Sequence, residues 1–344
     1  RGSARITLIS DESYTTFNPM LPEAVGASVF PEQVVVPVRE MLRTASGCSF
    51  IMGTVTHVDA TRRIVRCHSL AGELAIPYDH LVLAFGNRAK LDMLPGMAEH
   101  ALPLKTVGDA MHIRNSVLRR LARIELEHDP ALRRRLGHFI VIGGGFSGVE
   151  VAGELVDCLA SIRRYYPKVQ ADELHITVLH GTDRLLPELS PRLGAAALDS
   201  LTSRGVTVHL CTRAQALTPR GVTLQTGEQI DGQTLICTIG TETNPLAQML
   251  ALPLQQGRIL TNADLSVHGA PNMWALGDCA AVPNAHDGQL SPPTAQFAVR
   301  QARHLADNLI ARAAQGLRQA MRSMSAAGPN RSRSGWASWK MLSV

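Results

Sequence analysis

The chain lacks several features that define particular classes of protein. Aromatic residues make up only 4% of its 344 residues, and no stretch approaches the roughly 18 consecutive apolar residues of a membrane-spanning helix. The start resembles no signal peptide, and its opening on Arg1 instead of Met suggests a fragment. The short apolar runs predict that these residues form no membrane-spanning helix.

Cysteine is present but not in any pattern that carries chemistry. No C-x-x-C pair and no metal-ligand spacing occurs, which excludes the simplest dithiol redox site and gives no candidate metal site. We expect reduced, mostly buried thiols of a cytosolic protein. The six cysteines are Cys48, Cys67, Cys158, Cys211, Cys237 and Cys279.

Excess positive charge is confined to the C-terminal end. The net charge is +5, yet no acidic residue follows Asp307 and six basic residues do, so the preceding part carries −1. Because the chain up to Asp307 has no stripe of basic residues, we predict no nucleic-acid partner. The basic tail also contains Trp336 and Trp339, which is compatible with an anionic membrane surface or with a disordered segment.

The order of apolar stretches predicts an α/β fold. Residues 139–142 resemble a buried parallel strand and are followed by glycines and then by a helical pattern. Residues 48–78 alternate as in a small antiparallel meander, and residues 81–86 form an apolar strand that ends on glycine. The order of strand, meander and strand ending in glycine occurs twice, which indicates two related nucleotide-binding domains.

The strongest local signal is a G-x-G-x-x-G loop formed by Gly143, Gly145 and Gly148, directly after one strand and at the start of a helix. The glycines allow a tight turn, close approach to a pyrophosphate and close packing of the helix, whose N-terminus favours an anion. His180 ends the next strand, where an acid normally binds the adenosine ribose of NAD, and Arg184 is near it. The choice between NADH and NADPH therefore stays open.

A second signal is the apolar strand 272–276, which ends on Gly277 and Asp278. A strand-end aspartate beside a helix can accept hydrogen bonds from the polyol chain of a ligand, although it could equally cap a helix. The segment Pro-Pro-Thr-Ala-Gln at residues 292–296 then begins a helix that runs through Asn308.

In the order of these segments the chain resembles the type II NADH dehydrogenases, which are single-subunit NADH:quinone oxidoreductases of the FAD-dependent pyridine nucleotide oxidoreductases. The resemblance runs from about Ile6 to Ile310. The Gly-Val-Glu extension of the glycine loop and the pattern Ala-Gln-x-Ala-x-x-Gln narrow it to this family. Other segments that carry it are ITLISDESYTTFNPML, YDHLVLAFG, LPLKTVGDA, LLPELSPRLG, LICTIGTETNPL and NMWALGDCAAVP.

The resemblance implies two Rossmann-like domains of the two-dinucleotide-domain flavoprotein fold. It assigns residues 1–107 and 262–316 to a discontinuous FAD-binding domain and residues 108–261 to an NADH-binding domain. The family begins one strand and one glycine-rich loop earlier, so this chain is expected to lack that part of its flavin site. The tail 317–344 is expected to be disordered or to face a membrane.

The resemblance also implies roles for individual residues. Glu150 corresponds to a glutamate beside the stacked nicotinamide and flavin, and Gln296 and Gln301 lie at the quinone end. NADH is assigned to Gly143, Gly145, Gly148, His180 and Gly240. FAD is assigned to Ser10, Asp11, Val55, Gly86, Gly277, Asp278, Ala295 and Ala298.

The function implied is hydride transfer from NADH to FAD and onward to a membrane quinone, without proton pumping. The protein would lie peripherally on the cytoplasmic face of the inner membrane, with a homodimer left open. Two alternatives stand beside this interpretation. One is a sulfide:quinone oxidoreductase, which would need reactive cysteines near the flavin, and the other is an inactive truncated remnant.

Overall fold

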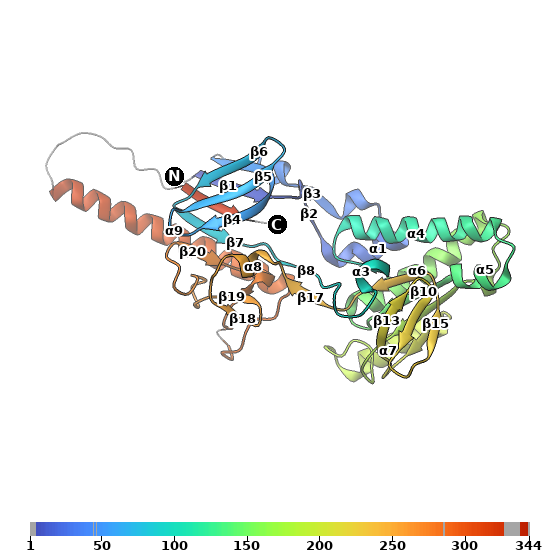
Figure 1. Ribbon diagram of the computed structural model, residues 1–344. Helices are drawn as coiled ribbons and strands as arrows, with labels where there is room; N and C mark the ends of the chain where they lie inside the picture. The colour runs from blue at the N-terminus through green and yellow to red at the C-terminus, as the bar shows by residue number, and fades with distance from the viewer. Residues whose placement is uncertain (1–4, 44, 46, 285, 327–337, 343–344) are drawn as a thin grey trace. The chain divides into compact units, whose positions relative to one another are not determined.

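The computed structural model describes residues 5–43, 45, 47–284, 286–326 and 338–342 (Figure 1). The chain divides into two compact units. Unit 1 comprises Arg1–Thr15, Pro37–Arg88 and Glu242–Val344, and unit 2 comprises Thr16–Val36 and Ala89–Thr241.

Unit 1 is built on a seven-stranded sheet with the order β20-β7-β22-β1-β4-β5-β6. The strands from β20 to β4 run parallel, and β4, β5 and β6 form the antiparallel meander that the alternating pattern predicted. Their bounds are β1 Arg5–Ser10, β4 Cys48–Asp59, β5 Ile64–Ser69, β6 Gly72–Pro77, β7 His80–Leu83, β20 Met273–Ala275 and β22 Ser338–Leu342.

The end of the chain contributes regular structure to unit 1. Helix α9 extends over Ala295–Ala326, and β22 pairs in parallel with β1 on one side and with β7 on the other. The described parts of 317–344 therefore form a helix and a strand, where the sequence left a disordered segment open, and the expected membrane-facing role stays a prediction. A strand in the middle of a parallel sheet satisfies its own backbone groups and those of two neighbours.

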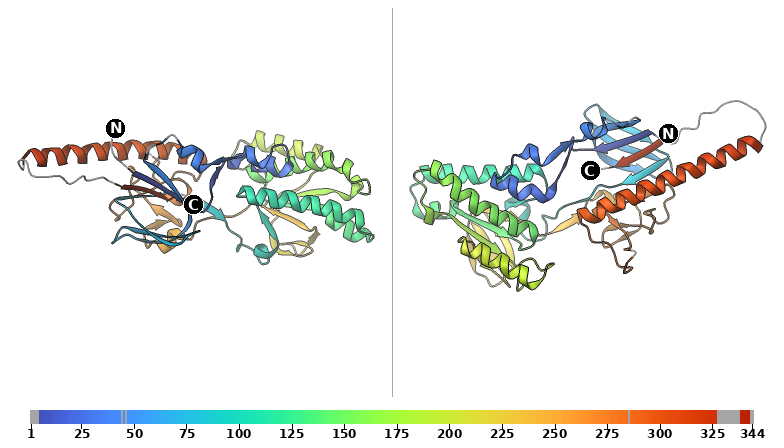
Figure 2. Two further views of the ribbon diagram at one scale, coloured as in Figure 1. Left: turned by 90° about the horizontal axis from the view of Figure 1, so that it is seen from above. Right: turned by 180° about the vertical axis from the view of Figure 1, so that it is seen from behind.

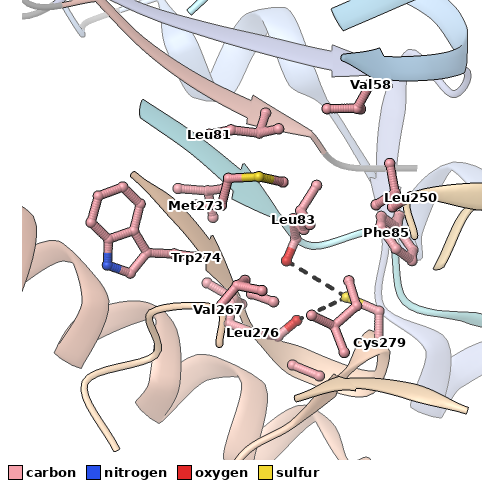
Figure 3. Packing of buried hydrophobic residues seen from close by; sticks show 14 of the residues in the cluster. Val58, Leu81, Leu83, Phe85, Leu250, Val267, Met273, Trp274, Leu276 and Cys279 are labelled. Atoms are coloured by element: carbon pink, nitrogen blue, oxygen red, sulfur yellow. Dashed lines mark hydrogen bonds between the residues drawn. The ribbon is translucent and has the colours of Figure 1, made fainter. Parts of the chain in front are cut away.

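The core of unit 1 lies against strands β7 and β20 (Figure 3). Leu81 and Leu83 of β7 are fully buried, and Trp274 of β20 is 1% exposed. The Cys279 thiol is also fully buried and donates to the carbonyl oxygens of Leu83 and Leu276, at 3.6 and 3.3 Å. The thiol thus connects the ends of the two strands.

Unit 2 is built on a five-stranded parallel sheet with the order β12-β11-β10-β16-β9. A three-stranded antiparallel sheet, β13-β14-β15, adds to it. The strands are β9 Ala101–Pro103, β10 His138–Ile142, β11 His175–Leu179, β12 Thr207–His209, β13 Ala214–Thr218, β14 Gly221–Leu224, β15 Gln229–Asp231 and β16 Thr234–Cys237. The longer helices are α4 Val107–Leu126, α5 Pro130–Leu136, α6 Phe146–Ile162 and α7 Pro191–Ser203.

Helix α1, Leu21–Gly26, belongs to unit 2, where it contacts α4 and α6 (Figure 2). Leu21 and Val25 are 3% and 1% exposed in the core that these helices share. Gly26 allows this packing, because a Cβ atom there would lie 2.7 Å from Cβ of Glu154. The segment 16–36, which the resemblance assigned to the FAD-binding domain, therefore lies in unit 2.

Two further boundaries differ from the expected domains. Residues 89–107 lie in unit 2, since β9 pairs with β16, and residues 242–261 lie in unit 1, since β19 pairs with β21. The remaining elements are β2 Tyr14–Thr16, η1 Asn18–Met20, η2 Pro31–Gln33, β3 Val35–Pro37, α2 Val38–Leu42, β8 Asn87–Ala89, α3 Met97–His100, η3 Arg163–Tyr165, η4 Ala171–Glu173, β17 Thr241–Thr243, α8 Leu246–Met249, β18 Leu254–Gln255, β19 Arg258–Leu260, η5 Gly277–Cys279 and β21 Ala280–Ala281. Among the described residues, no helix combines the length and apolar character needed to cross a bilayer.

Candidate nucleotide and flavin sites

The glycine loop of unit 2 joins β10 to α6 in the strand–turn–helix arrangement that the sequence predicted. Gly143 has a φ of +118°, a conformation that favours glycine. A Cβ atom on Gly148 would lie 1.8 Å from the carbonyl oxygen of Gly143, so only glycine lets the first turn of α6 lie this close to the strand. Both positions therefore need glycine for the loop itself.

The third glycine, Gly145, is different because its surroundings are open. It is the N-cap of the 17-residue α6, no side chain caps that end, and a Cβ atom placed on it would have nothing within 4 Å. Phe146 and Ser147 in the first turn are exposed. Free backbone N–H groups at an open helix N-terminus fit the pyrophosphate of a dinucleotide.

His180 contacts this loop from the end of β11. The backbone N–H of Gly144 donates to its Nδ1 at 3.0 Å, and its Nε2 lies 2.7 Å from Oγ1 of Thr182. The Thr182 hydroxyl in turn donates to the carbonyl oxygen of Arg184 at 3.1 Å. The network assigns a neutral ring with its proton on Nε2, and burial lowers the pKa of His180.

Glu150 lies one turn into α6 and is exposed to solvent. Partial burial of its carboxyl group raises its pKa, and the charge of Glu23 on α1 adds to this. Glu23 was not a candidate from the sequence, because only the packing of α1 on α6 brings the two acids together. Gly240, another predicted nucleotide residue, follows β16 with a φ of +76°.

In unit 1, the predicted flavin and quinone residues Gly277, Ala298 and Gln301 lie together where β20 ends, and Asp278 adjoins them. Gly277 has a φ of +71°, and its N–H donates to Oε1 of Gln301 at 2.8 Å. A Cβ atom on Gly277 would be 3.6 Å from Cβ of Ala298, so α9 lies close to this turn. Asp278 follows directly in η5, and Ala295 and Gln296 begin α9 as exposed residues.

The remaining flavin candidates belong to neighbouring parallel strands. Ser10 ends β1, is 5% exposed and accepts the N–H of Glu12 at 3.3 Å, and Asp11 is exposed. Val55 in β4 is 7% exposed, and Gly86 after β7 has a φ of +63°. The ends of β1, β7 and β20 face the same edge of the sheet, which is where open α/β sheets bind ligands.

These residues fit only part of a flavin dinucleotide. Asp278 can accept hydrogen bonds from the ribityl chain, and Ser10 and Asp11 stand where the adenosine end is expected. Within the described residues of unit 1, however, no glycine-rich turn leads from a parallel strand into a helix. They thus supply no cradle for the FAD pyrophosphate of the kind that unit 2 offers.

Comparison with known proteins decides the family. Residues 1–302 match the family of pyridine nucleotide-disulphide oxidoreductases. The chain belongs to this family. It is 33% identical over 310 residues to demethylphylloquinone reductase NdbB of Synechocystis sp. The aligned residues cover 88% of this chain and 71% of that protein. It is 28% identical over 327 residues to the external alternative NADH-ubiquinone oxidoreductase of Yarrowia lipolytica, covering 88% and 55%.

A protein of known structure shares the fold. NDH2 from Plasmodium falciparum, solved in complex with NADH, superposes with a TM-score of 0.77 at 22% identity, covering 81% of this chain and 60% of that one. The resemblance to type II NADH dehydrogenases and the fold class are thereby confirmed. The chain spans about half the length of several relatives, for example 50% of an Arabidopsis thaliana NAD(P)H-ubiquinone oxidoreductase.

Cys158, on the helix after the glycine loop, and Cys279, directly after Asp278, are both buried. Cys279 is fully buried, and burial raises its pKa to about 11. Burial also raises the pKa of Cys158, which is 8% exposed. Because the thiolate is the nucleophile, burial and a raised pKa disfavour the reactive form of both groups near neutral pH. This argues against the sulfide:quinone oxidoreductase alternative, although such an enzyme from Aquifex aeolicus shares the fold with a TM-score of 0.68.

Proposed function

We propose that the protein is a flavin-dependent oxidoreductase that takes hydride from a reduced nicotinamide nucleotide and passes the electrons to a quinone, without proton pumping. The observation that carries the proposal is the open N-terminus of α6 at Gly145, with Gly143 and Gly148 shaping the loop below it. The relatives that are named as NADH:quinone oxidoreductases support the donor and the acceptor.

The roles of the residues follow from what each side chain can do. The α6 N-terminus binds the nucleotide pyrophosphate, and Glu150, whose pKa is raised by burial and by the charge of Glu23, exchanges a proton at the nicotinamide end. FAD, when bound, would supply the hydride acceptor and the electron donor for the quinone, and Asp278 would hold its ribityl chain. Gln296, exposed at the start of α9, donates its amide N–H to a quinone carbonyl as negative charge develops there.

The setting of the reaction is part of the same proposal. A quinone dissolved in a bilayer requires peripheral contact with a membrane surface, and we place the protein on the cytoplasmic face of the inner membrane, in a respiratory chain. Homodimer formation is compatible with this setting. The basic charges after Asp307 favour an anionic surface.

An anaerobic titration tests the function. The chain is incubated with FAD, then titrated with reduced nucleotide and next with a quinone, while flavin absorbance is followed. We expect bleaching by the nucleotide, reoxidation by the quinone and no bleaching by sulfide. Absence of any nucleotide-dependent bleaching in a preparation with stoichiometric FAD would refute the proposal, and bleaching by sulfide alone would favour the alternative enzyme. A chain that retains no FAD would support the inactive-remnant alternative.

Two substitutions test the site. Glu150→Gln should slow nucleotide-dependent flavin reduction and leave reoxidation unchanged, and Gln296→Ala should raise the KM for quinone. Glu228→Gln serves as the control, because Glu228 is exposed beside the turn between β14 and β15. Wild-type kinetics in both test variants would refute the residue roles while leaving the fold intact.

A further inference from the structure

We propose that the site in unit 2 prefers a nicotinamide nucleotide with a 2′-phosphate on its adenosine ribose, NADPH, and that Arg213 is the residue that recognises this phosphate. The inference rests on the proposed function, since it assumes that the loop at Gly143 to Gly148 binds a nucleotide. It names the donor, which the sequence left open.

The position of the ribose follows from the parallel strands. In a dinucleotide-binding unit, the end of the second strand lies beside the adenosine ribose, and an acid there accepts the ribose hydroxyl groups. Here β11 is that strand, and the N–H of Gly143 donates to the carbonyl oxygen of Leu179 at 2.9 Å. His180 is the next residue and contacts Gly144 directly. The position normally held by the acid is therefore held by an uncharged side chain.

His180 also cannot replace the acid as an acceptor. Its Nδ1 already accepts the N–H of Gly144, and its Nε2–H is directed at Thr182. A carboxylate at this position would repel a phosphate group, whereas this ring, engaged on both sides, does not. With His180 at this position, the negative charge that would repel a 2′-phosphate is absent.

Arg213 reaches this place from the loop after β12. That loop runs beside the residues after β11: the N–H of Thr212 donates to the carbonyl oxygen of His180, and the N–H of Cys211 to that of Thr182, both at 2.8 Å. The Arg213 side chain consequently crosses Gly181, where a Cβ atom would lie 3.1 Å from both Cγ and Nε of the arginine. Glycine at 181 leaves the arginine room beside the predicted ribose.

The charges around this place favour an anion. Arg213 is exposed and has no ion-pair partner among the described residues. Arg184 is a second positive charge on the neighbouring loop, and its Nη2 donates a hydrogen bond to the carbonyl oxygen of Pro187 at 2.9 Å. Asp183 and Glu188 are acids on the same loop, but both are solvent-exposed, so water and salt screen their repulsion. A guanidinium that donates two parallel hydrogen bonds to phosphate outweighs a screened charge.

Direct binding measurements test the preference without requiring catalysis. The full chain is titrated with NADPH and with NADH at one fixed salt concentration, and binding is followed by the fluorescence of the reduced nicotinamide. Hydrogen bonds to a charged group contribute about 1.5–3 kcal/mol, so we expect NADPH to bind roughly ten- to a hundredfold more tightly. The same ratio is expected for 2′,5′-ADP against 5′-AMP as competitors.

Variants identify the residue responsible. Arg213→Gln should remove most of the preference by weakening NADPH binding, with a much smaller effect on NADH. Arg220→Gln is the matched control, because this exposed arginine is paired with Asp231 at 2.9 Å in another part of unit 2. His180→Glu should reverse the preference. Because this change also removes the contact with Gly144, its folding is checked by circular dichroism.

The outcomes separate this inference from the function on which it rests. If neither nucleotide binds, the proposed function fails and the inference fails with it. If NADH binds at least as tightly as NADPH, or if Arg213→Gln weakens both equally, only the inference is overturned.

Discussion

Replacing Gly148 by alanine tests whether the close approach of α6 to β10 is required for the loop. The new Cβ atom would lie 1.8 Å from the carbonyl oxygen of Gly143 and 2.9 Å from Oγ1 of Thr238. The nearest atom belongs to the backbone, so the helix or the loop must move. Overpacking costs about 1–3 kcal/mol, and the overlap argues for the upper end. Alanine regains about 0.5–1 kcal/mol of helix propensity, which leaves a net loss of about 2 kcal/mol.

Urea unfolding of unit 2, followed by far-ultraviolet circular dichroism, measures this loss. With a slope of about 2 kcal/mol per molar urea, the midpoint should fall by about 1 M. Gly145→Ala is the matched control, because its Cβ atom meets nothing within 4 Å and loss of a glycine cap costs under about 1 kcal/mol. Its methyl group would, however, occupy the space over the helix N-terminus, so nucleotide binding should weaken.

Gly148→Ala is expected to lower stability, and Gly145→Ala is expected to weaken nucleotide binding with little loss of stability. Each expectation has its own refuting result. An unchanged midpoint for Gly148→Ala would show that the loop accommodates a side chain, so the geometric reason for this glycine would be wrong. Unchanged nucleotide affinity for Gly145→Ala would show that the pyrophosphate does not lie over the N-terminus of α6.

Three further predictions concern stability. Arg133 donates to both carboxylate oxygens of Glu173 and to three carbonyl groups, and both side chains are about 15% exposed. Arg133→Ala leaves the Glu173 carboxylate without its partner, so it should lower the free energy of unfolding of unit 2 by about 3–5 kcal/mol, measured by urea unfolding. Burial lowers the pKa of His138, so the unfolded chain binds a proton near pH 6.5 that the folded chain refuses. Stability should therefore fall as the pH drops below about 6.5, and His138→Gln should reduce this slope in melting temperatures measured from pH 8 to 5. Deleting residues 338–344 removes β22, the described strand that joins β7 to β1, so hydrogen exchange should accelerate in both strands and stay unchanged in unit 2.

The sequence alone determined the features whose physical cause is local. The spacing of Gly143, Gly145 and Gly148 after an apolar run specified a strand, a tight turn and a helix, because backbone conformation and close approach act within six residues. The alternation over 48–78 specified the antiparallel meander for the same reason, since neighbouring strands are joined by short turns.

Only the tertiary structure decided which distant residues meet. Segment 16–36 carries no local mark of its unit, and it joins unit 2 because α1 buries its apolar face against α4 and α6. The pairing of β22 between β1 and β7 joins residues more than 250 positions apart in the sequence. The position of Arg213 across Gly181 likewise depends on hydrogen bonds between two loops. Such contacts are set by the packing and backbone pairing of whole elements, and no short sequence pattern encodes them.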